Sequence, residues 1–300
     1  MSARTRSAKS VAMAEISASA DISHYTSIVQ DSLDYIGITI QTMNIEPRSS
    51  RPSTAIESEA NALLETVDAT SPAALSACSG WTAHEITAHL TAGAVEIALN
   101  LEAYGDGKSV PATRGLEERE APFRSLDEKR LREELPKSIA RMANAIDAVL
   151  AAEPDAVVPW TGRQMAVASF ITHMRSELAI HRWDLVGDDE RSLELLALPD
   201  LTNHAVTVLG RVLLSRGTAS ATAAFSASLK SPGDMDIVVI VDADGARLTR
   251  SEGVSQPSIT GDRAALLLFL WGRRPGDPRR LTAPMGRDTL AKIEALLAGY

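Results

Sequence analysis

Two ionisable side chains, Glu177 and His181, stand four residues apart in the segment SELAIHRWDL, residues 176–185. Positions i and i+4 of a helix differ by about 40° and lie one above the other, so both side chains would point in one direction. The same broad face carries apolar residues, namely Phe170, Met174, Leu178 and Leu185. The pair therefore points into a helical core or to its rim, where an unpaired carboxylate is costly.

Two explanations account for this pair. In the first, Glu177 and His181 form an ion pair within the helix, or Glu177 pairs with Arg175 or Arg182. In the second, the carboxylate and the imidazole are two ligands of a metal ion, as inward side chains of helical bundles are. A third ligand from another helix would favour the metal site.

Histidines elsewhere in the chain differ in their ability to supply that ligand. In the segment WTAHEITAHL an apolar stripe is centred on Ile86. His84 lies about 160° from this centre and is expected to face solvent, whereas His89 lies about 60° away, at the margin of the core. His89 can thus face the glutamate, although a buried histidine satisfied by a hydrogen bond is the alternative. His173, one turn before the glutamate, is a further candidate ligand or partner of a ligand, and His204 has no expected role.

Apolar periodicity predicts four helices, over about residues 53–67, 82–104, 126–152 and 165–186. The second begins at a capping box, TAHE, with Thr82 as N-cap and Glu85 three residues later. Residues 105–125 are charged, contain prolines and are expected to form a connection. Four helices joined by such connections predict a four-helix bundle.

The chain changes character after Pro199. One more helix is expected to about residue 215, followed by three strands, a short fourth strand and two helices: ATAAFSASL, DIVVIVD and GARLTRS, then PSITGD, and residues 262–271 and 287–297. The tripeptide ADG between the second and third strands predicts a hairpin turn. The predicted fold class is α+β, with a poorly ordered extension over residues 1–52, a bundle over 53–198 and an α+β domain over 199–300.

Composition narrows the classes of function. The 300 residues carry a formal charge of −9, which argues against a nucleic-acid partner because phosphate binding needs clustered Lys and Arg. The longest apolar run, AALLLFLW, is far shorter than the roughly 20 residues that cross a bilayer. A single cysteine, Cys78, fits a reducing cytoplasm, and the Ser-rich first fifty residues lack the apolar core of a secretory signal.

Five motifs in this order carry a resemblance to a known family: WTAHEITAHL, RSELAIHRWDL, GARLTRS, PSITGD and ALLLFLWGR. Together they resemble the maleylpyruvate isomerase family of mycothiol-dependent, DinB-like metalloproteins, over about residues 53–298. The resemblance implies a DinB-like four-helix bundle followed by a small α+β domain of the SCP2-like type.

The resemblance also implies a metal site and a catalytic arginine. The metal ligands of the family fall on His89, Glu177 and His181, which would hold Zn²⁺ or another divalent ion and leave a coordination position open. A catalytic arginine is expected beyond the second helix, where Arg114 and Arg119 are the candidates and Arg119 is preferred. A solvated run of charges is the alternative explanation for both arginines.

Three neighbours of these residues have open roles. Asp184 either accepts a hydrogen bond from a ligating imidazole or pairs with Arg182. Trp183 is expected in the core, and Cys78 is expected to be a small, inert side chain.

The implied function is metal-dependent activation of a low-molecular-weight thiol, mycothiol, for addition to an electrophilic small molecule. The outcome would be cis–trans isomerisation of maleylpyruvate or thiol S-transfer. The alternative is a non-catalytic regulatory protein that binds a metal or a small molecule. The expected partners are thus a thiol and an electrophile, with no nucleic acid and no membrane, and no sustained apolar seam in the sequence fixes an oligomeric state.

Overall fold

The structure is a computed structural model that describes residues 52–210, 224–253 and 256–297. The predicted N-terminal extension, apart from its last residue, and the end of the helix expected to reach residue 215 lie outside the described residues. Residues 49–300 form one compact unit by their contacts. The boundary predicted between residues 198 and 199 stays a prediction.

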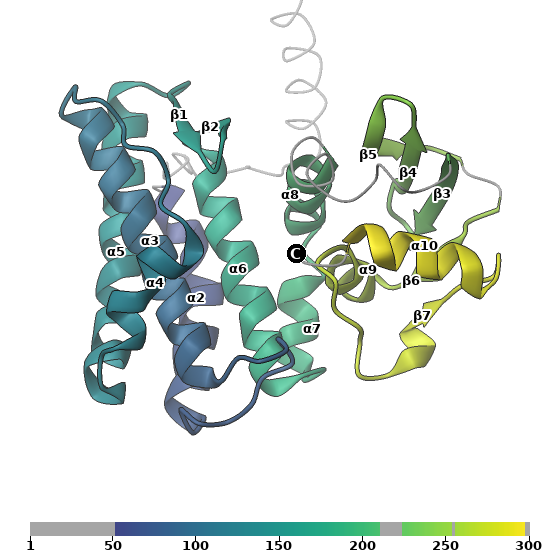
Figure 1. The fold of residues 1–300 in the computed structure, drawn as a ribbon, viewed down its shortest axis with the longest axis horizontal. Coiled ribbons are helices and arrows are strands. Elements are labelled where there is room, and N and C mark those ends of the chain that lie inside the picture. The colour runs from purple at the N-terminus through teal and green to yellow at the C-terminus, as the bar shows by residue number, and fades with distance from the viewer. Residues whose placement is uncertain (1–51, 211–223, 254–255, 298–300) are drawn as a thin grey trace, which may run out of the picture. The chain divides into compact units, whose positions relative to one another are not determined.

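Four long helices form the first part of this unit, as predicted, and follow a short 3-10 turn, η1 (Pro52–Ile56) (Figure 1). They are α2 (Glu57–Ala69), α3 (Ala83–Gly105), α5 (Glu128–Ala152) and α6 (Ser169–Val186). Their apolar stripes meet in one core cluster, in which the largest fully buried side chains include Leu63, Ile86, Leu135 and Phe170. Because α3 and α6 run in opposite directions, the same level of the bundle is reached early in α3 and late in α6.

The predicted capping box fixes where α3 begins. The Thr82 side chain accepts a hydrogen bond from the backbone N–H of Glu85, and the Glu85 carboxylate accepts one from the backbone N–H of Thr82 at 2.6 Å. Two backbone donors that the helix start would leave unpaired are thereby satisfied.

Two elements in the connections differ from the prediction. Residues 105–125 contain a helix, α4 (Leu116–Arg124), and the stretch before α6 is a hairpin of β1 (Val157–Trp160) and β2 (Arg163–Ala166). The expected start of the fourth helix near residue 165 was therefore wrong. Thr161 and Gly162 both have positive φ, 47° and 80°, which closes a two-residue turn, and strand β1 alternates exposed and buried residues.

The second part of the unit combines short helices with a five-stranded sheet of order β5-β4-β3-β6-β7, so the predicted helical region followed by a sheet region is confirmed. Its elements are α7 (Glu190–Leu196), α8 (Pro199–Val208), β3 (Phe225–Lys230), β4 (Asp236–Asp242), β5 (Gly245–Ser251), β6 (Ile259–Gly261), α9 (Arg263–Leu270), η5 (Pro278–Arg280), β7 (Leu281–Thr282) and α10 (Arg287–Leu297). Helix α7 was not predicted. The four predicted strands and the two last helices are confirmed, and the ADG hairpin closes where Asp242 pairs with Gly245.

Helix α6 packs on both sides. Phe170, Met174 and Leu178 belong to the core of the bundle, whereas Ile180 and Trp183 belong to a second cluster that includes the sheet residues. The prediction that Trp183 is a core residue is confirmed, since it is 5% exposed and its indole N–H donates to Asp188 at 2.6 Å. Among the described residues, no helix is both long and apolar enough to span a membrane.

Candidate metal centre

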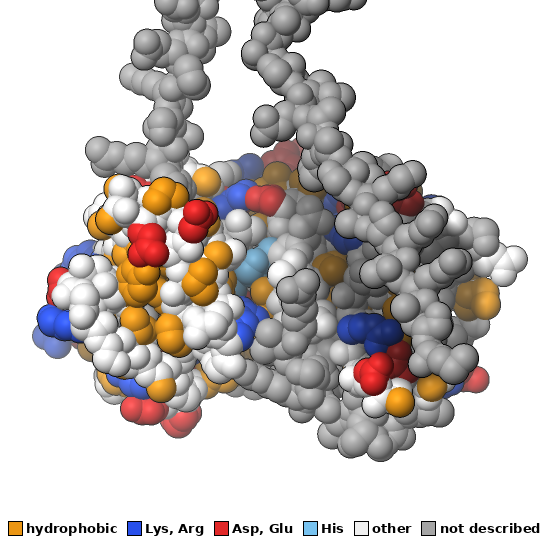
Figure 2. Space-filling model, turned by 90° about the horizontal axis from the view of Figure 1, so that it is seen from above, with side chains coloured by type: hydrophobic (Ala, Val, Ile, Leu, Met, Phe, Trp, Pro, Cys, Tyr) orange, Lys and Arg blue, Asp and Glu red, His pale blue; other side chains and the backbone are white. Residues whose placement is uncertain are grey.

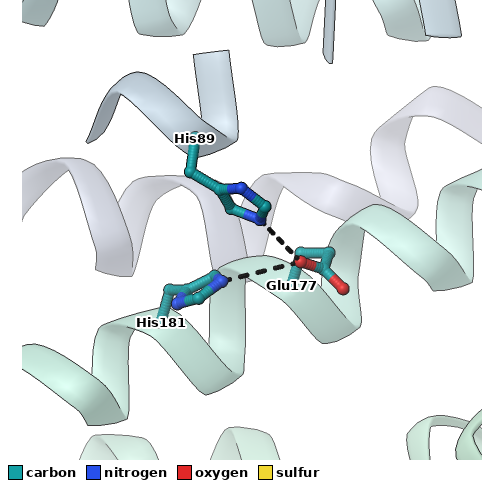
Figure 3. Close-up of side chains that lie close together, drawn as sticks. All are labelled: His89, Glu177 and His181. Carbon is teal, nitrogen blue, oxygen red and sulfur yellow. Dashed lines mark hydrogen bonds and ion pairs between the residues drawn. The ribbon is translucent and has the colours of Figure 1, made fainter. Parts of the chain in front are cut away.

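The three residues proposed as metal ligands converge from two helices, with His89 on α3 and Glu177 and His181 on α6 (Figure 3). The Nε2 atoms of His89 and His181 lie 3.4 and 3.6 Å from the same carboxylate oxygen, Oε2 of Glu177. The potential ligand atoms all lie within 4.8 Å of one another. The i, i+4 spacing therefore does place the α6 pair on one face, and His89 completes a cluster of two imidazoles and one carboxylate.

A buried carboxylate orients the first imidazole. Glu120, which is 0% exposed, lies 2.7 Å from Nδ1 of His89, and its other oxygen accepts a hydrogen bond from Arg124 at 2.6 Å. A carboxylate at Nδ1 accepts the proton there and leaves the lone pair of Nε2 free for a metal. Glu120 comes from α4, the helix missing from the sequence prediction, so its role could not be assigned from the sequence.

The second imidazole has the same arrangement. Oδ2 of Asp184 lies 2.9 Å from Nδ1 of His181, and Arg273 donates to both oxygens of Asp184 at 2.9 and 3.2 Å. Of the two roles considered for Asp184, the structure thus supports the hydrogen bond to the imidazole, while Arg182 pairs instead with Asp189 at 2.6 Å. Both imidazoles present Nε2 to the centre and Nδ1 to a carboxylate.

Electrostatics favour a cation between these groups. Burial alone would raise the pKa of Glu177, but hydrogen bonds from His181 and His89 outweigh it and hold this pKa well below the usual range. Burial alone would lower the pKa of His89, yet the neighbouring carboxylates of Glu120 and Glu177 raise it. A site that stabilises both a carboxylate and extra positive charge fits a divalent ion, and two imidazoles with one carboxylate are a donor set that Zn²⁺ accepts.

A small molecule can approach this region. The side chains of His89, Glu177 and His181 retain 13%, 23% and 6% exposure. Histidine atoms are visible at the surface of the molecule in Figure 2. The indole of Trp81 lies over the site, with its ring 5.0 Å from that of His89 and 6.1 Å from that of His181, so an apolar wall closes one side.

The two arginine candidates have different surroundings. Arg114 is held by the buried Glu96, to which its Nη2 donates at 2.6 Å and its Nε at 2.8 Å. The Nε atom of Arg119 is buried and has no hydrogen-bond partner among the residues that the structure describes. The charge of Arg119 acts on Glu120, which contacts His89. The buried Nε–H of Arg119 is therefore unpaired among the described residues, whereas the guanidinium of Arg114 is already paired.

The surroundings of three other residues can be compared with their predicted roles, namely His84, His204 and Cys78. His84 was predicted to face solvent, but it is only partly exposed. Its Nε2 lies 3.1 Å from the carbonyl oxygen of Arg124, the last residue of α4. His204, which had no expected role, is buried and lies 3.3 Å from His173. Burial raises the pKa of the Cys78 thiol, which agrees with an inert side chain.

Comparisons with known proteins show a likeness in sequence family and in fold. Residues 53–186 match the family model described as the mycothiol maleylpyruvate isomerase N-terminal domain. Crystal structures of the mycothiol-dependent maleylpyruvate isomerase and of a mutant of it superpose with a TM-score of 0.52 at 17% sequence identity, covering 79% of this chain and 92% of the other. A search among curated proteins found no match. The resemblance to the mycothiol-dependent maleylpyruvate isomerase family, inferred from the motifs, is thus confirmed, with the family model covering residues 53–186.

Proposed function

We propose that this protein is a metal-dependent enzyme that activates a low-molecular-weight thiol, mycothiol, for addition to an electrophilic small molecule. The reaction would be cis–trans isomerisation of maleylpyruvate or thiol S-transfer. The observation that carries the proposal is the convergence of two Nε2 atoms and one carboxylate oxygen, with each Nδ1 held by a buried carboxylate. A reducing cytoplasm is the compartment that suits a thiol-dependent enzyme with one cysteine.

Three residues would bind the ion and two others would orient the imidazoles. His89, Glu177 and His181 would hold the ion, which we take to be Zn²⁺, and three protein ligands leave a position open for a further ligand. When bound, the ion would favour the thiolate form of the thiol at neutral pH, so that a nucleophile is available for an electrophilic double bond. Glu120 and Asp184 would keep the two imidazoles in the ligating tautomer.

Arg119 would serve the electrophile. Its buried Nε–H lacks a partner among the described residues, and an unpaired buried donor is costly until an acceptor arrives. A carboxylate or an enolate oxygen of the electrophile is such an acceptor, and a guanidinium binds it with charge-assisted hydrogen bonds. The indole of Trp81 would limit the access of water to the reacting atoms.

Metal analysis of purified protein tests the foundation of this proposal. Under zinc-replete conditions, the wild type should carry one zinc per chain, and His89→Ala, Glu177→Gln and His181→Ala should each lose most of it. His84→Ala is a matched control, since this histidine lies on the same helix and contacts Arg124 instead of the centre. A wild type without stoichiometric zinc would contradict the proposal.

Incubation of the zinc-loaded protein with mycothiol and maleylpyruvate then separates the two reactions. Fumarylpyruvate with no conjugate in the mass spectrum indicates an isomerase, and a stable thiol conjugate indicates an S-transferase. If zinc binds but no product or conjugate forms with maleylpyruvate or a panel of electrophiles, the non-catalytic binding protein becomes the better explanation.

A further inference from the structure

A second pair of histidines lies beside the candidate metal centre and is not used by it. Nδ1 of His173 on α6 lies 3.3 Å from Nε2 of His204 on α8, and the ring centroids are 5.4 Å apart. The indole of Trp160 packs edge-on against His173 at 6.3 Å. His204 is 9% exposed, while His173 is partly exposed. The pair thus joins two helices, and His173 is the more exposed of its two residues.

Helix geometry directs His173 toward the space next to the metal ligands. His173, Glu177 and His181 occupy positions i, i+4 and i+8 of α6, so their side chains follow one another along one face. Opposite them on α3, Gly93 follows His89 by one turn, and no described atom lies within 4 Å of where a Cβ on Gly93 would be. Glycine within a helix destabilises the helix by about 1 kcal/mol relative to alanine. The open space beside Gly93 is therefore kept at the expense of helix stability.

Arg119 adds a positive charge to this space. Burial lowers the pKa of His173, and the charges of Arg163, Arg119 and His89 lower it further against the opposing effect of Glu177. Burial, together with His173, lowers the pKa of His204 to about 3. Both imidazoles are therefore neutral near pH 7, and each carries one proton.

The contact between two neutral rings links their tautomers, because only one of the two facing nitrogens can carry the proton. If Nε2–H of His204 donates, Nδ1 of His173 accepts and the single proton of His173 must be on Nε2. His173 then offers a donor to a ligand. In the reverse arrangement, His173 would present a bare nitrogen, which an electron-rich oxygen cannot use. Because Arg119 and the candidate metal ligands lie nearby, we expect the bound group to be an electron-rich oxygen.

We propose that His173 is a further catalytic residue, which donates its Nε2–H to the carbonyl oxygen of an α,β-unsaturated electrophile, and that His204 is the positioning residue that fixes the required tautomer. The inference rests on the proposed function and adds one residue to it, a hydrogen-bond donor for the carbonyl that is conjugated with the reacting double bond. A neutral imidazole suits this task because it can strengthen its hydrogen bond as negative charge develops on the oxygen.

The electron balance is that of thiol addition itself. As the C–S bond forms, the π electrons of the carbon–carbon double bond shift to the conjugated carbonyl oxygen, which accepts the hydrogen bond of His173. In an isomerase they return when the C–S bond breaks. In an S-transferase the neighbouring carbon takes up the proton that the thiol released. His173 keeps its proton throughout.

Binding of maleate to the zinc-loaded protein, without thiol, tests the role of His173 by calorimetry. His173→Leu should weaken binding about 10-fold or more, as expected for a lost hydrogen bond to a charged oxygen. His173→Gln should bind maleate with an affinity within about 3-fold of that of the wild type, because its amide N–H can replace Nε2–H. A wild type that does not bind maleate, or a His173→Leu variant that binds it as tightly, would overturn the proposal.

The tautomer itself tests the role of His204 without any reaction. Two-bond ¹H–¹⁵N spectra of the wild type should show His173 protonated on Nε2. This signature should persist in His204→Gln, which keeps a donor, and change in His204→Phe, which keeps only the ring shape. A wild-type His173 protonated on Nδ1 would overturn the assignment even if every variant failed to fold. Zinc and thiol binding are measured separately, so failure of the proposed function is distinguished from failure of this inference.

Discussion

Each imidazole of the candidate centre depends on a carboxylate and an arginine behind it. His89 is held by Glu120 and Arg124, and His181 is held by Asp184 and Arg273. Such partners orient a ligand and raise its basicity, so they contribute to metal affinity without touching the metal. The two carboxylates should therefore have measurable effects on zinc binding.

Removal of Glu120 tests this contribution. Glu120→Ala should weaken zinc binding about 10- to 100-fold, because Nδ1 of His89 loses the acceptor that keeps Nε2 free. A competition titration with a chelator measures the change. Glu117→Ala is the matched control, since Glu117 lies on the same helix and pairs with Arg124 but is 82% exposed and does not contact His89. Equal affinities for the two variants would contradict the prediction.

The sequence allowed the candidate ligand cluster and one of its two supporting carboxylates to be predicted. The spacing of Glu177 and His181 reports a shared helix face, and the offset of His89 from an apolar stripe reports its direction. Asp184 was a candidate partner because it is three residues from His181. Glu120 was not, because its burial depends on α4 folding back onto α3, a tertiary contact that leaves no periodic pattern in a polar segment.

At the scale of elements, the contact between α6 and α8 contains two imidazoles that burial keeps neutral. The ordinary pKa of histidine is about 6.5, and that of His204 in the folded chain is lowered to about 3. Between these values the unfolded chain binds a proton that the folded chain does not. Stability is therefore fully present above pH 6.5 and is lost as the pH falls toward 3.

Replacing His204 tests this pH dependence. In urea unfolding, the wild type should lose up to about 1.4 kcal/mol per pH unit from His204 alone as the pH falls below 6.5. His204→Phe should lose less over the same interval, because the buried titrating group is gone. Measurements between pH 6.5 and 5.5 keep most carboxylates out of the comparison. Parallel curves for the two proteins would show that His204 has no such linkage.

The elements that the sequence predicted well are those with a long, regular pattern. The four long helices have apolar stripes, and strands β4 and β5 flank a two-residue turn. The elements that were missed are short. Helix α4 contains Pro122 and is mostly polar, and the β1–β2 hairpin contains Pro159 and turns at Thr161, a residue type that rarely has positive φ.

At the scale of the whole molecule, the C-terminal part supports the candidate metal centre. Arg273 follows α9 and reaches Asp184, whose side chain is 0% exposed, on the far side of His181. Arg280 likewise pairs with Asp188 at 3.0 Å, one residue after the end of α6 is capped. The position of a candidate metal ligand in the bundle thus depends on a residue about ninety positions later in the chain.

Removal of the Arg273 guanidinium tests this dependence. Arg273→Leu should destabilise the protein by about 3 kcal/mol, because the buried Asp184 carboxylate loses its cation. It should also weaken zinc binding through His181. Urea unfolding and a chelator titration measure the two effects. Arg279→Leu, an 88% exposed arginine of the same region, should change neither, and an unaltered zinc affinity in Arg273→Leu would argue against the dependence.

Helix α6 packs against two hydrophobic cores, and this should protect the arrangement of the candidate ligands on it from local fluctuations. Residues of this helix belong to both hydrophobic clusters, so the helix cannot open locally without disturbing two cores. Its backbone amides, including those of Glu177 and His181, should therefore exchange with solvent deuterium only when the whole compact unit unfolds. Two of the three ligands would then be preorganised with the full stability of the fold, even before a metal is bound.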